Sequence, residues 1–301
     1  MNLNELKVSR RAVLRALPAV GMCLNLRGFA APPGSAEEKI AAIEKGIGAR
    51  LGVVALDTGS GRRIGYRADE RFAMCSTFKL LLAGCILSRT DKGSERLSRR
   101  IPYTKQDLLE YAPVTGTAEN LRAGAMTVGN LCAAAVEVSD NTAANLLLDQ
   151  VGGPAGLTAF VRSLGDRVTR LDRKEPELNT AVAGDVRDTT SPEAMAGSME
   201  KLLVGNALNL ASRKLLAVWL RQSTTGGKRL RAGVPASWQV GDKTGTGYRG
   251  AIGDAGIFWP PQRKPILIAA YVMEGDASRT QREQAIASVG RVVAEWIVAG
   301  A

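Results

Sequence analysis

Three short polar motifs in this chain carry the residue types of a serine-based hydrolytic site. They are Ser76-Thr77-Phe78-Lys79, Ser139-Asp140-Asn141 and Lys243-Thr244-Gly245. In the first motif a hydroxyl and an amine lie one helical turn apart, so Lys79 can accept the proton of a nucleophilic Ser76. Ser139 and Lys243 supply a second hydroxyl to pass that proton on and a second cation to hold an anionic substrate. We therefore expect an enzyme with a nucleophilic serine.

The absence of histidine narrows the chemistry further. Ser-His-Asp catalysis and most zinc hydrolase sites need imidazole groups, so both are excluded. We expect neither a metal nor another cofactor. Any hydrolysis must use serine, lysine and carboxylate side chains.

Each motif on its own also has a plain structural interpretation. Ser76 alone would be a helix N-cap, Ser139-Asp140-Asn141 a polar cap, and Lys243-Thr244-Gly245 a strand-end turn. The Ser-x-x-Lys spacing is weak, because a second copy, Ser198-Met199-Glu200-Lys201, lies in a helical stretch with no other motif beside it. Ser76 differs because it opens an apolar helix, where backbone N–H groups favour developing negative charge. The three motifs together favour a catalytic site.

The order of the motifs resembles that of class A serine β-lactamases and penicillin-binding proteins, over nearly the whole chain. Residues 170–179, Arg-Leu-Asp-Arg-Lys-Glu-Pro-Glu-Leu-Asn, are similar to the omega loop of the class A β-lactamases. The resemblance implies hydrolysis of the β-lactam amide of penicillins and cephalosporins through a serine acyl-enzyme, which confers antibiotic resistance. The implied partners are small β-lactam molecules.

The resemblance also implies a role for each site residue. The catalytic set is Ser76, Lys79, Ser139 and Glu175. Ser76 attacks, Lys79 or a water on Glu175 takes its proton, Ser139 protonates the leaving nitrogen, and Glu175 activates the hydrolytic water. The backbone N–H groups of Ser76 and Thr246 match the oxyanion hole. The substrate-binding set is Tyr111, Asn141, Asn179, Arg229, Lys243, Thr244 and Thr246.

Further positions refine the resemblance around the loop. Arg173 and Asp188 match a pair that closes its ends, and Asn145 matches a residue that braces it. Relatives often have a cis bond before the position of Pro176. Lys174 stands where many relatives have tryptophan.

Arg229 and Thr246 are shared with the serine-carbapenemase branch and some other broad-spectrum enzymes. Arg229 replaces an arginine that other relatives carry at the position of Ile252. Gly245 is expected to let the substrate lie against the strand edge. No cysteine follows the Lys-Thr-Gly motif, so the branch's disulfide to the position of Cys75 is absent. We expect Cys75, Cys85 and Cys132 to be buried, inert thiols.

The distribution of apolar residues predicts the fold. Helices are predicted at 36–48, through much of 76–221 and at 280–298, and strands at 51–56, 63–66, 239–246, 253–259 and 266–273. Strands at both ends with helices between them predict an α/β (α+β) fold: an antiparallel sheet flanked by helices, plus an all-helical lobe. We expect the α/β lobe at 31–72 and 222–301, the helical lobe at 73–221, and the site in the cleft between them.

The N-terminus resembles an export signal. Residues 9–14 hold a twin-arginine pattern, Ser-Arg-Arg-Ala-Val-Leu, before a weakly apolar stretch and small residues near Ala30. The alternative is a basic leader without that function. We expect a signal at 1–30, cleaved between about Arg27 and Ser35, ahead of a catalytic domain at 31–301, and a periplasmic or secreted monomer.

Charge and hydropathy limit the other partners. The net charge is +11, but no basic run interleaves with aromatic residues, so a solvated basic surface is expected rather than nucleic-acid binding. No apolar run reaches the roughly 18 residues of a membrane span, so stable membrane association is not expected.

Two related functions compete with the hydrolytic one. A penicillin-binding D,D-peptidase shares the three motifs but usually lacks the Glu-x-x-x-Asn element formed here by Glu175 and Asn179. A covalent β-lactam receptor needs a signalling domain or a membrane span, and the sequence shows neither. An inactive relative that binds a partner stays open on sequence alone.

Overall fold

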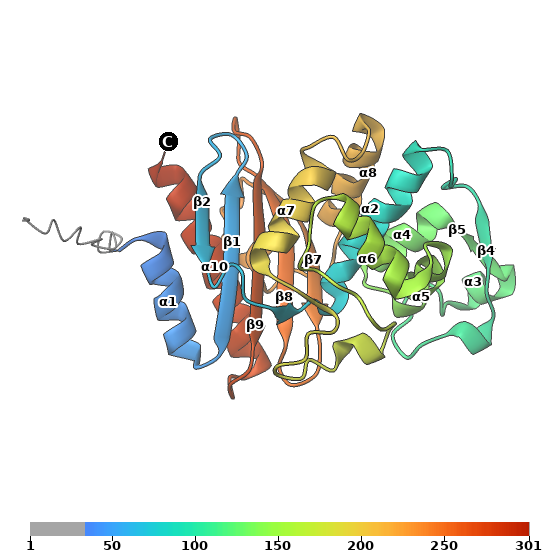
Figure 1. Ribbon diagram of the computed structural model, residues 1–301, viewed down its shortest axis with the longest axis horizontal. Helices are drawn as coiled ribbons and strands as arrows, with labels where there is room; N and C mark the ends of the chain where they lie inside the picture. The colour runs from blue at the N-terminus through green and yellow to red at the C-terminus, as the bar shows by residue number, and fades with distance from the viewer. Residues whose placement is uncertain (1–33, 301) are drawn as a thin grey trace, which may run out of the picture.

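A five-stranded antiparallel sheet and a group of helices beside it form the molecule (Figure 1). The computed structural model describes residues 34–300. The strand order is β2-β1-β9-β8-β7, so the two N-terminal strands pair with the three C-terminal ones. The strands are β1 (Arg50–Asp57), β2 (Arg63–Tyr66), β7 (Gln239–Thr246), β8 (Ile252–Trp259) and β9 (Ile266–Met273). This confirms the prediction of one antiparallel sheet within an α+β fold.

Both faces of the sheet are covered, and the pleat of β1 and β9 shows how. Ile268 and Ala270 belong to the apolar cluster beneath α1 (Ala36–Ile47) and α10 (Arg279–Ala299). The residues that alternate with them in β9, Leu267 and Ala269, belong to the cluster on the opposite face, which α7 (Pro192–Leu203) covers. Alternate side chains of a strand point to opposite faces, so these strands are apolar throughout. Figure 1 shows α7 in front of the sheet and α10 behind it.

The helical lobe is built around α2 (Phe78–Asp91), whose first eleven residues are all buried. A helix that is apolar on every side must be surrounded, and α2 contacts α4, α5, α6 and α8. The remaining helices are α3 (Ala118–Ala123), α4 (Val128–Glu137), α5 (Asn141–Gln150), α6 (Gly153–Ser163), α8 (Leu210–Arg221) and α9 (Leu230–Gly233). The short 3-10 turns are η1 (Cys75–Thr77), η2 (Lys105–Asp107) and η3 (Glu177–Asn179).

Two helices of the segment expected to form the helical lobe pack against the sheet. Within the range 73–221, α7 packs against β1 and β9, and α8 packs against β7. Position along the chain therefore does not separate the lobes as sharply as predicted, because a sheet with two apolar faces needs helices on both. Two small ribbons join distant segments: β3 (Phe72–Ala73) with β6 (Thr189–Thr190), and β4 (Arg100–Pro102) with β5 (Ala125–Thr127).

The proposed export signal at 1–30 and Cys23 lie outside the described residues. Among residues 34–300, no helix is long and apolar enough to cross a bilayer. In that same part of the chain, Cys75, Cys85 and Cys132 are free and buried. Burial raises the pKa of Cys75 to about 12 and that of Cys85 to about 11, so both are protonated thiols at neutral pH.

Candidate active site

A cleft of about 350 Å³ brings the predicted residues together at the β7 edge of the sheet. Its walls come from η1, the segment before α5, the loop that follows α6, strand β7 and the start of α10. Eight predicted site residues line it: Ser76, Tyr111, Ser139, Asn141, Asn179, Arg229, Thr244 and Thr246. The other three, Lys79, Glu175 and Lys243, are buried and contact this set through hydrogen bonds.

Ser76 lies on the 3-10 turn η1 rather than in the helix proper, which begins at Phe78. It does not cap that helix; its Oγ donates to Oε1 of Glu175 across 3.2 Å. The turn packs closely on β7, because a Cβ on Gly245 would lie 2.5 Å from the carbonyl oxygen of Met74. Gly245 therefore allows strand β7 to pack against the turn η1.

Lys79 is fully buried beneath Ser76. Its Nζ lies 3.0 Å from Oε1 of Glu175 and donates to the carbonyl of Ser139 at 2.9 Å and to Oδ1 of Asn141. Burial lowers the pKa of Lys79, and the negative charge of Glu175 opposes that shift. A lysine with a lowered pKa beside a serine is a candidate proton acceptor.

Within the Ser139-Asp140-Asn141 motif, Asp140 has a structural role, whereas Ser139 and Asn141 face the cleft. Asp140 caps α5, accepting from the backbone N–H of Ala143, and it also holds Thr115. The cap interpretation is thus correct for Asp140 alone. Ser139 has a left-handed backbone (φ 62°) that turns its side chain into the cleft. Asn141 faces the same cleft, so one tight turn supplies both polar groups.

Lys243, on strand β7, connects the Lys243-Thr244-Gly245 motif to Ser139. Its Nζ donates to Oγ of Ser139 at 3.1 Å and to the carbonyl of Thr244 at 3.0 Å. Burial, and then the charge of Lys79, lower the pKa of Lys243 to about 7, although Asp242 and Asp254 act to raise it. This ammonium is therefore close to its titration point at neutral pH.

Glu175 is held on a loop that is fastened at several points. Asn145 of α5 donates to its carbonyl at 2.8 Å and accepts from its N–H at 3.0 Å. The peptide bond to Pro176 is cis. Asn179 donates to Oε2 of Glu175, while the buried Oδ1 of Asn179 has no protein partner. Lys174, at the tryptophan position of many relatives, pairs instead with Asp149 on α5.

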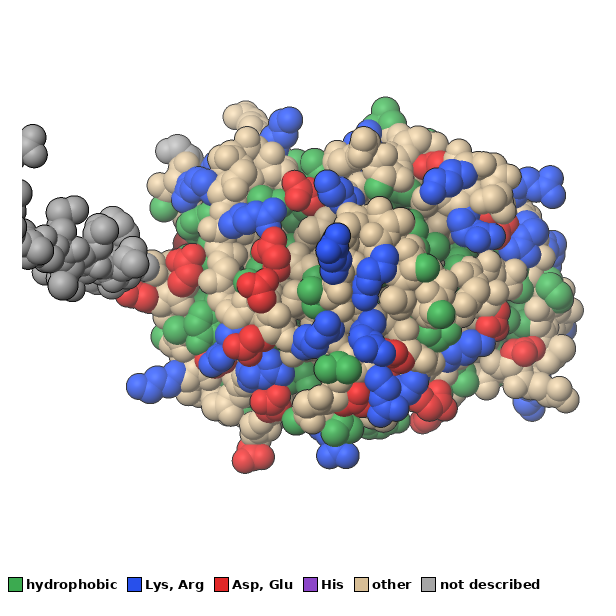
Figure 2. All heavy atoms as spheres, in the orientation of Figure 1, with side chains coloured by type: hydrophobic (Ala, Val, Ile, Leu, Met, Phe, Trp, Pro, Cys, Tyr) green, Lys and Arg blue, Asp and Glu red, His purple; other side chains and the backbone are tan. Residues whose placement is uncertain are grey.

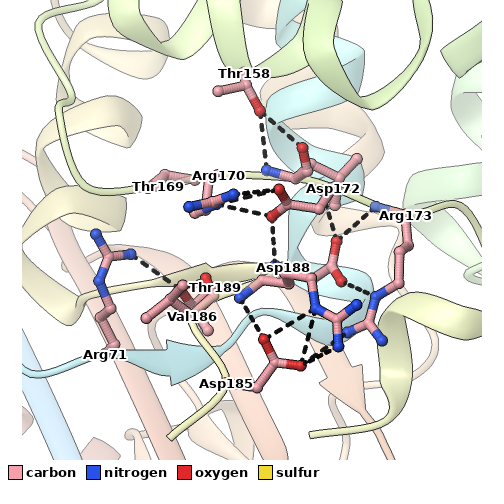
Figure 3. Close-up of polar contacts among 12 residues, drawn as sticks. Arg71, Thr158, Thr169, Arg170, Asp172, Arg173, Asp185, Val186, Asp188 and Thr189 are labelled. Atoms are coloured by element: carbon pink, nitrogen blue, oxygen red, sulfur yellow. Dashed lines mark hydrogen bonds and ion pairs between the residues drawn. The ribbon is translucent and has the colours of Figure 1, made fainter.

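The base of the same loop is closed by Asp188, as Figure 3 shows. Its Oδ1 accepts from the backbone N–H groups of Asp172 and Arg173, and its Oδ2 pairs with Nε of Arg173. The carboxylate is only 1% exposed, so these bonds lie in a weakly screened environment. The expected pairing of Arg173 with Asp188 is present.

Arg229 is 2% exposed yet reaches the cleft. It donates to the carbonyls of Gly245 and Gly253 at 2.7 and 2.9 Å, to Oγ1 of Thr246 at 2.7 Å, and lies 3.4 Å from Glu283. Ile252, at the alternative arginine position, is buried in the cluster beneath α10. The cleft's second cation is thus supplied by Arg229.

Sequence reasoning missed two residues of the cleft, Thr225 and Arg279. Thr225 forms a 2.6 Å hydrogen bond with Thr244, and Arg279 pairs with Glu283 at the start of α10. No local pattern marks either one, because both reach the site only through tertiary packing. Tyr111 lines the cleft and is 51% exposed, so it is not a core aromatic residue.

In the described part of the chain, no group of three or more His, Cys, Asp or Glu side chains is placed to hold a metal. A serine hydroxyl, two buried lysines and a loop carboxylate meet instead at the edge of an antiparallel sheet. Fold and site together define a serine hydrolase that works without histidine.

Comparison with known proteins places the chain within that class. The model of the β-lactamase enzyme family matches residues 35–297. The chain belongs to this family, and its relatives make it a class A serine β-lactamase. It hydrolyses β-lactams, an activity that confers antibiotic resistance.

The relatives are similar along most of their length. A β-lactamase of Streptomyces albus G is 49% identical over 87% of this chain and 84% of its own. The β-lactamase CTX-M-25 of Escherichia coli is 42% identical over 96% of this chain and 98% of its own. The solved structure of an ancestral class A β-lactamase is 57% identical, with a TM-score of 0.85 over 87% of this chain and all of that one.

Proposed function

We propose that Ser76 is the nucleophile, that Lys79 and Glu175 handle its proton, and that Glu175 alone activates the hydrolytic water. One observation carries the assignment. Oε1 of Glu175 lies 3.2 Å from Oγ of Ser76 and 3.0 Å from Nζ of Lys79, so one carboxylate oxygen meets both the hydroxyl and the amine. A proton can therefore leave Ser76 toward either group.

In acylation, Oγ of Ser76 bonds to the lactam carbonyl carbon and the carbon–nitrogen bond breaks. The proton of Ser76 moves to the base, and the leaving nitrogen receives a proton through Ser139. Ser139 suits this relay because its Oγ accepts from Lys243 at 3.1 Å and lies 3.4 Å from Lys79. The backbone N–H groups of Ser76 and Thr246 stabilise the developing oxyanion.

In deacylation, Glu175 removes a proton from a water whose oxygen bonds to the ester carbon. The bond from that carbon to Oγ of Ser76 then breaks, and Oγ receives the proton back from Glu175, which lies 3.2 Å away. The free Oδ1 of Asn179 is available to accept the water's other hydrogen. A D,D-peptidase usually lacks the Glu-x-x-x-Asn element. Glu175 and Asn179, fixed to each other and to α5, therefore favour a hydrolase over a penicillin-binding protein.

The substrates we propose are penicillins and cephalosporins, whose carboxylate would bind Lys243, Thr244, Thr246 and Arg229. These groups place two cations and two hydroxyls at one end of the cleft. Asn141 would bind the acyl side-chain amide, and Tyr111 would form the opposite wall. Bidentate donors such as guanidinium suit carboxylate recognition.

The test uses Glu175→Gln with benzylpenicillin. Turnover should fall by about 10²–10⁴-fold, the usual size of general-base catalysis, and intact-mass spectrometry should find the acyl-enzyme accumulating. The matched control is Glu177→Gln, an exposed glutamate two residues away, which should keep the parent rate. Parent-rate turnover by Glu175→Gln would remove Glu175 from the mechanism.

The nucleophile is tested separately by covalent labelling. Ser76→Ala should give no adduct, whereas Ser198→Ala, the serine of the second Ser-x-x-Lys copy, should be labelled as the parent is. An adduct on the Ser76→Ala protein would identify another nucleophile.

We also propose that residues 1–30 direct export by a twin-arginine route and that the mature enzyme is a periplasmic or secreted monomer. The sequence pattern at 9–14 supports the route. Replacing Arg10 and Arg11 by Lys should leave the enzyme in the cytoplasm, measured by fractionation.

A further inference from the structure

A second cavity, of about 200 Å³, lies behind the loop that carries Glu175 and shares no residue with the cleft. Its polar walls are four arginines and one carboxylate: Arg50, Arg71, Arg173, Arg187 and Asp185. We call it the arginine pocket. Arg50 comes from β1 and Arg71 from the segment before β3, whereas the other three come from the loop. The pocket therefore lies between the sheet and the base of the loop.

The carboxylates around the arginine pocket leave one guanidinium without a charged partner. Arg50 pairs with Glu70 and Glu274, neither of which lines the pocket. Arg173 and Arg187 both lie near Asp185. Arg71 donates to the carbonyl of Val168 and to Oγ1 of Thr189, and it forms no ion pair with any residue of 34–300. Figure 3 shows Arg71 beside Thr189.

The balance of charge at this surface points to an anionic ligand. Four guanidinium groups and one carboxylate line the pocket, and Glu70, Glu274 and Asp188 pair with Arg50 and Arg173 from outside it. The positive charge that no carboxylate of residues 34–300 pairs with is therefore that of Arg71. Figure 2 shows basic side chains gathered on this side, over α7 and the loop that follows α6. The floor is apolar and buried, formed by Ala73 and Met273. Guanidinium groups donate in a planar fork that matches a tetrahedral oxyanion.

We propose that the arginine pocket is a binding site for a small tetrahedral oxyanion, phosphate or sulfate. The ion would take the free donors of Arg71 and share Arg187 and Arg173 with Asp185. A volume of about 200 Å³ holds such an ion together with a few waters, each of which needs roughly 30 Å³. Occupation would link the sheet to residues 181–187 of the loop.

The experiment measures binding of radiolabelled inorganic phosphate by equilibrium dialysis at constant ionic strength. The cleft also holds cations, so the measurements are made in the parent and in Lys243→Ala, which removes a cation from the cleft. About one equivalent of phosphate should remain bound in Lys243→Ala. Adding Arg71→Ala should weaken that binding at least about tenfold, as expected for the loss of a charge-assisted hydrogen bond.

Two controls separate the site from general charge effects. Arg122→Ala removes an exposed arginine of the helical lobe and should leave phosphate binding unchanged. Arg187→Ala removes a second, largely exposed pocket arginine and should weaken it, which keeps the test valid if Arg71→Ala fails to fold by circular dichroism. Glycerol phosphate is the comparison ligand. If it binds more tightly than phosphate, the pocket is assigned to a phosphomonoester; if it binds more weakly, the pocket is assigned to the free ion.

Hydrogen exchange gives an independent readout. Phosphate should slow exchange in residues 181–187 of the parent and not of Arg71→Ala. Binding that disappears with Lys243→Ala, binding that is indifferent to both pocket arginines, or no saturable binding at all would each overturn the proposal.

Discussion

Two lysine ammonium groups lie close together in the active site, and they differ in what surrounds them. Lys79 has a carboxylate at 3.0 Å, whereas Lys243 contacts only a hydroxyl and a carbonyl. Like charges and burial both disfavour protonation of Lys243. Of the two, Lys243 is therefore the group whose charge should respond to pH near neutrality.

The pH profile should expose this response. Lys243 holds the substrate carboxylate only while protonated, so kcat/KM should fall as pH rises through about 7, the pKa of the free enzyme. A bound carboxylate raises the pKa of Lys243, so kcat should fall at higher pH than kcat/KM. Steady-state kinetics with benzylpenicillin between pH 5 and 10 measure both.

Lys243→Arg provides the control for that profile. A guanidinium stays charged throughout this range, so the alkaline limb of kcat/KM should disappear even if the overall rate falls. A limb that stays at the same pH in Lys243→Arg would belong to another group.

The lowered pKa of Lys243 also affects folding. Between about pH 7 and pH 10.5 the lysine is protonated in the unfolded chain but largely neutral in the folded protein. The unfolded chain therefore binds more protons, and this residue makes the free energy of unfolding rise with pH in that range.

At the scale of single residues, the sequence predicted hydroxyl, amine and carboxylate groups that meet at the cleft, because these residues stand in marked motifs. It did not predict Thr225 or Arg279, which enter the cleft by packing alone. It also did not predict the packing role of Gly245, since only coordinates reveal that the Met74 carbonyl occupies the space of a side chain there.

Among the elements, the loop from Arg170 to Asp188 has the most direct link to turnover. Its base is closed through one carboxylate, that of Asp188, which accepts two backbone N–H groups and pairs with Arg173. Asp188 has a left-handed backbone (φ 56°) that asparagine also tolerates. Replacement by asparagine therefore changes the charge and the bonds without straining the chain.

Asp188→Asn should loosen the loop and slow deacylation. The lost charge-assisted bonds correspond to about 1–3 kcal/mol of stability, less than for a fully buried pair because Arg173 is partly exposed. Hydrogen exchange should rise between residues 172 and 188, and acyl-enzyme should accumulate in stopped-flow traces. The exposed pair of Lys174 with Asp149 offers the control: Asp149→Asn should change stability by under about 1 kcal/mol. Equal effects of the two variants would contradict a special role for Asp188.

The elements themselves were largely predictable. The five strands of the sheet were located within one residue, and three of them, β1, β8 and β9, are largely apolar runs bounded by turn residues. The 3-10 turn at Ser76 and the left-handed backbone of Ser139 were not predicted, because neither follows from local preference. Both are held by their surroundings, and both are at the site.

For the whole molecule, stability and catalysis should be separable. The cluster beneath α1 and α10 contains no residue of the cleft. Ile40 of α1 is fully buried in it, so Ile40→Ala should reduce the free energy of unfolding by about 2–5 kcal/mol. Denaturant unfolding measures that loss, and kcat/KM at 25 °C should be unchanged.

The neighbouring residue supplies the control. Lys39→Ala removes an exposed ion pair with Glu295 and should cost less than about 1 kcal/mol. If Ile40→Ala instead reduced kcat/KM in the folded protein, the cluster would be coupled to the cleft.

Strand β1 pairs along its whole length with β9, from Arg50 opposite Met273 to Asp57 opposite Ile266. More than two hundred residues separate this N-terminal hairpin from its partner strand β9. During synthesis, the hairpin therefore leaves the ribosome long before β9 does. Lys243 emerges only shortly before that partner. A nascent chain stalled ahead of β9 can form its central helices but has neither a closed sheet nor a complete cleft, so the enzyme gains its activity in the last steps of its own synthesis.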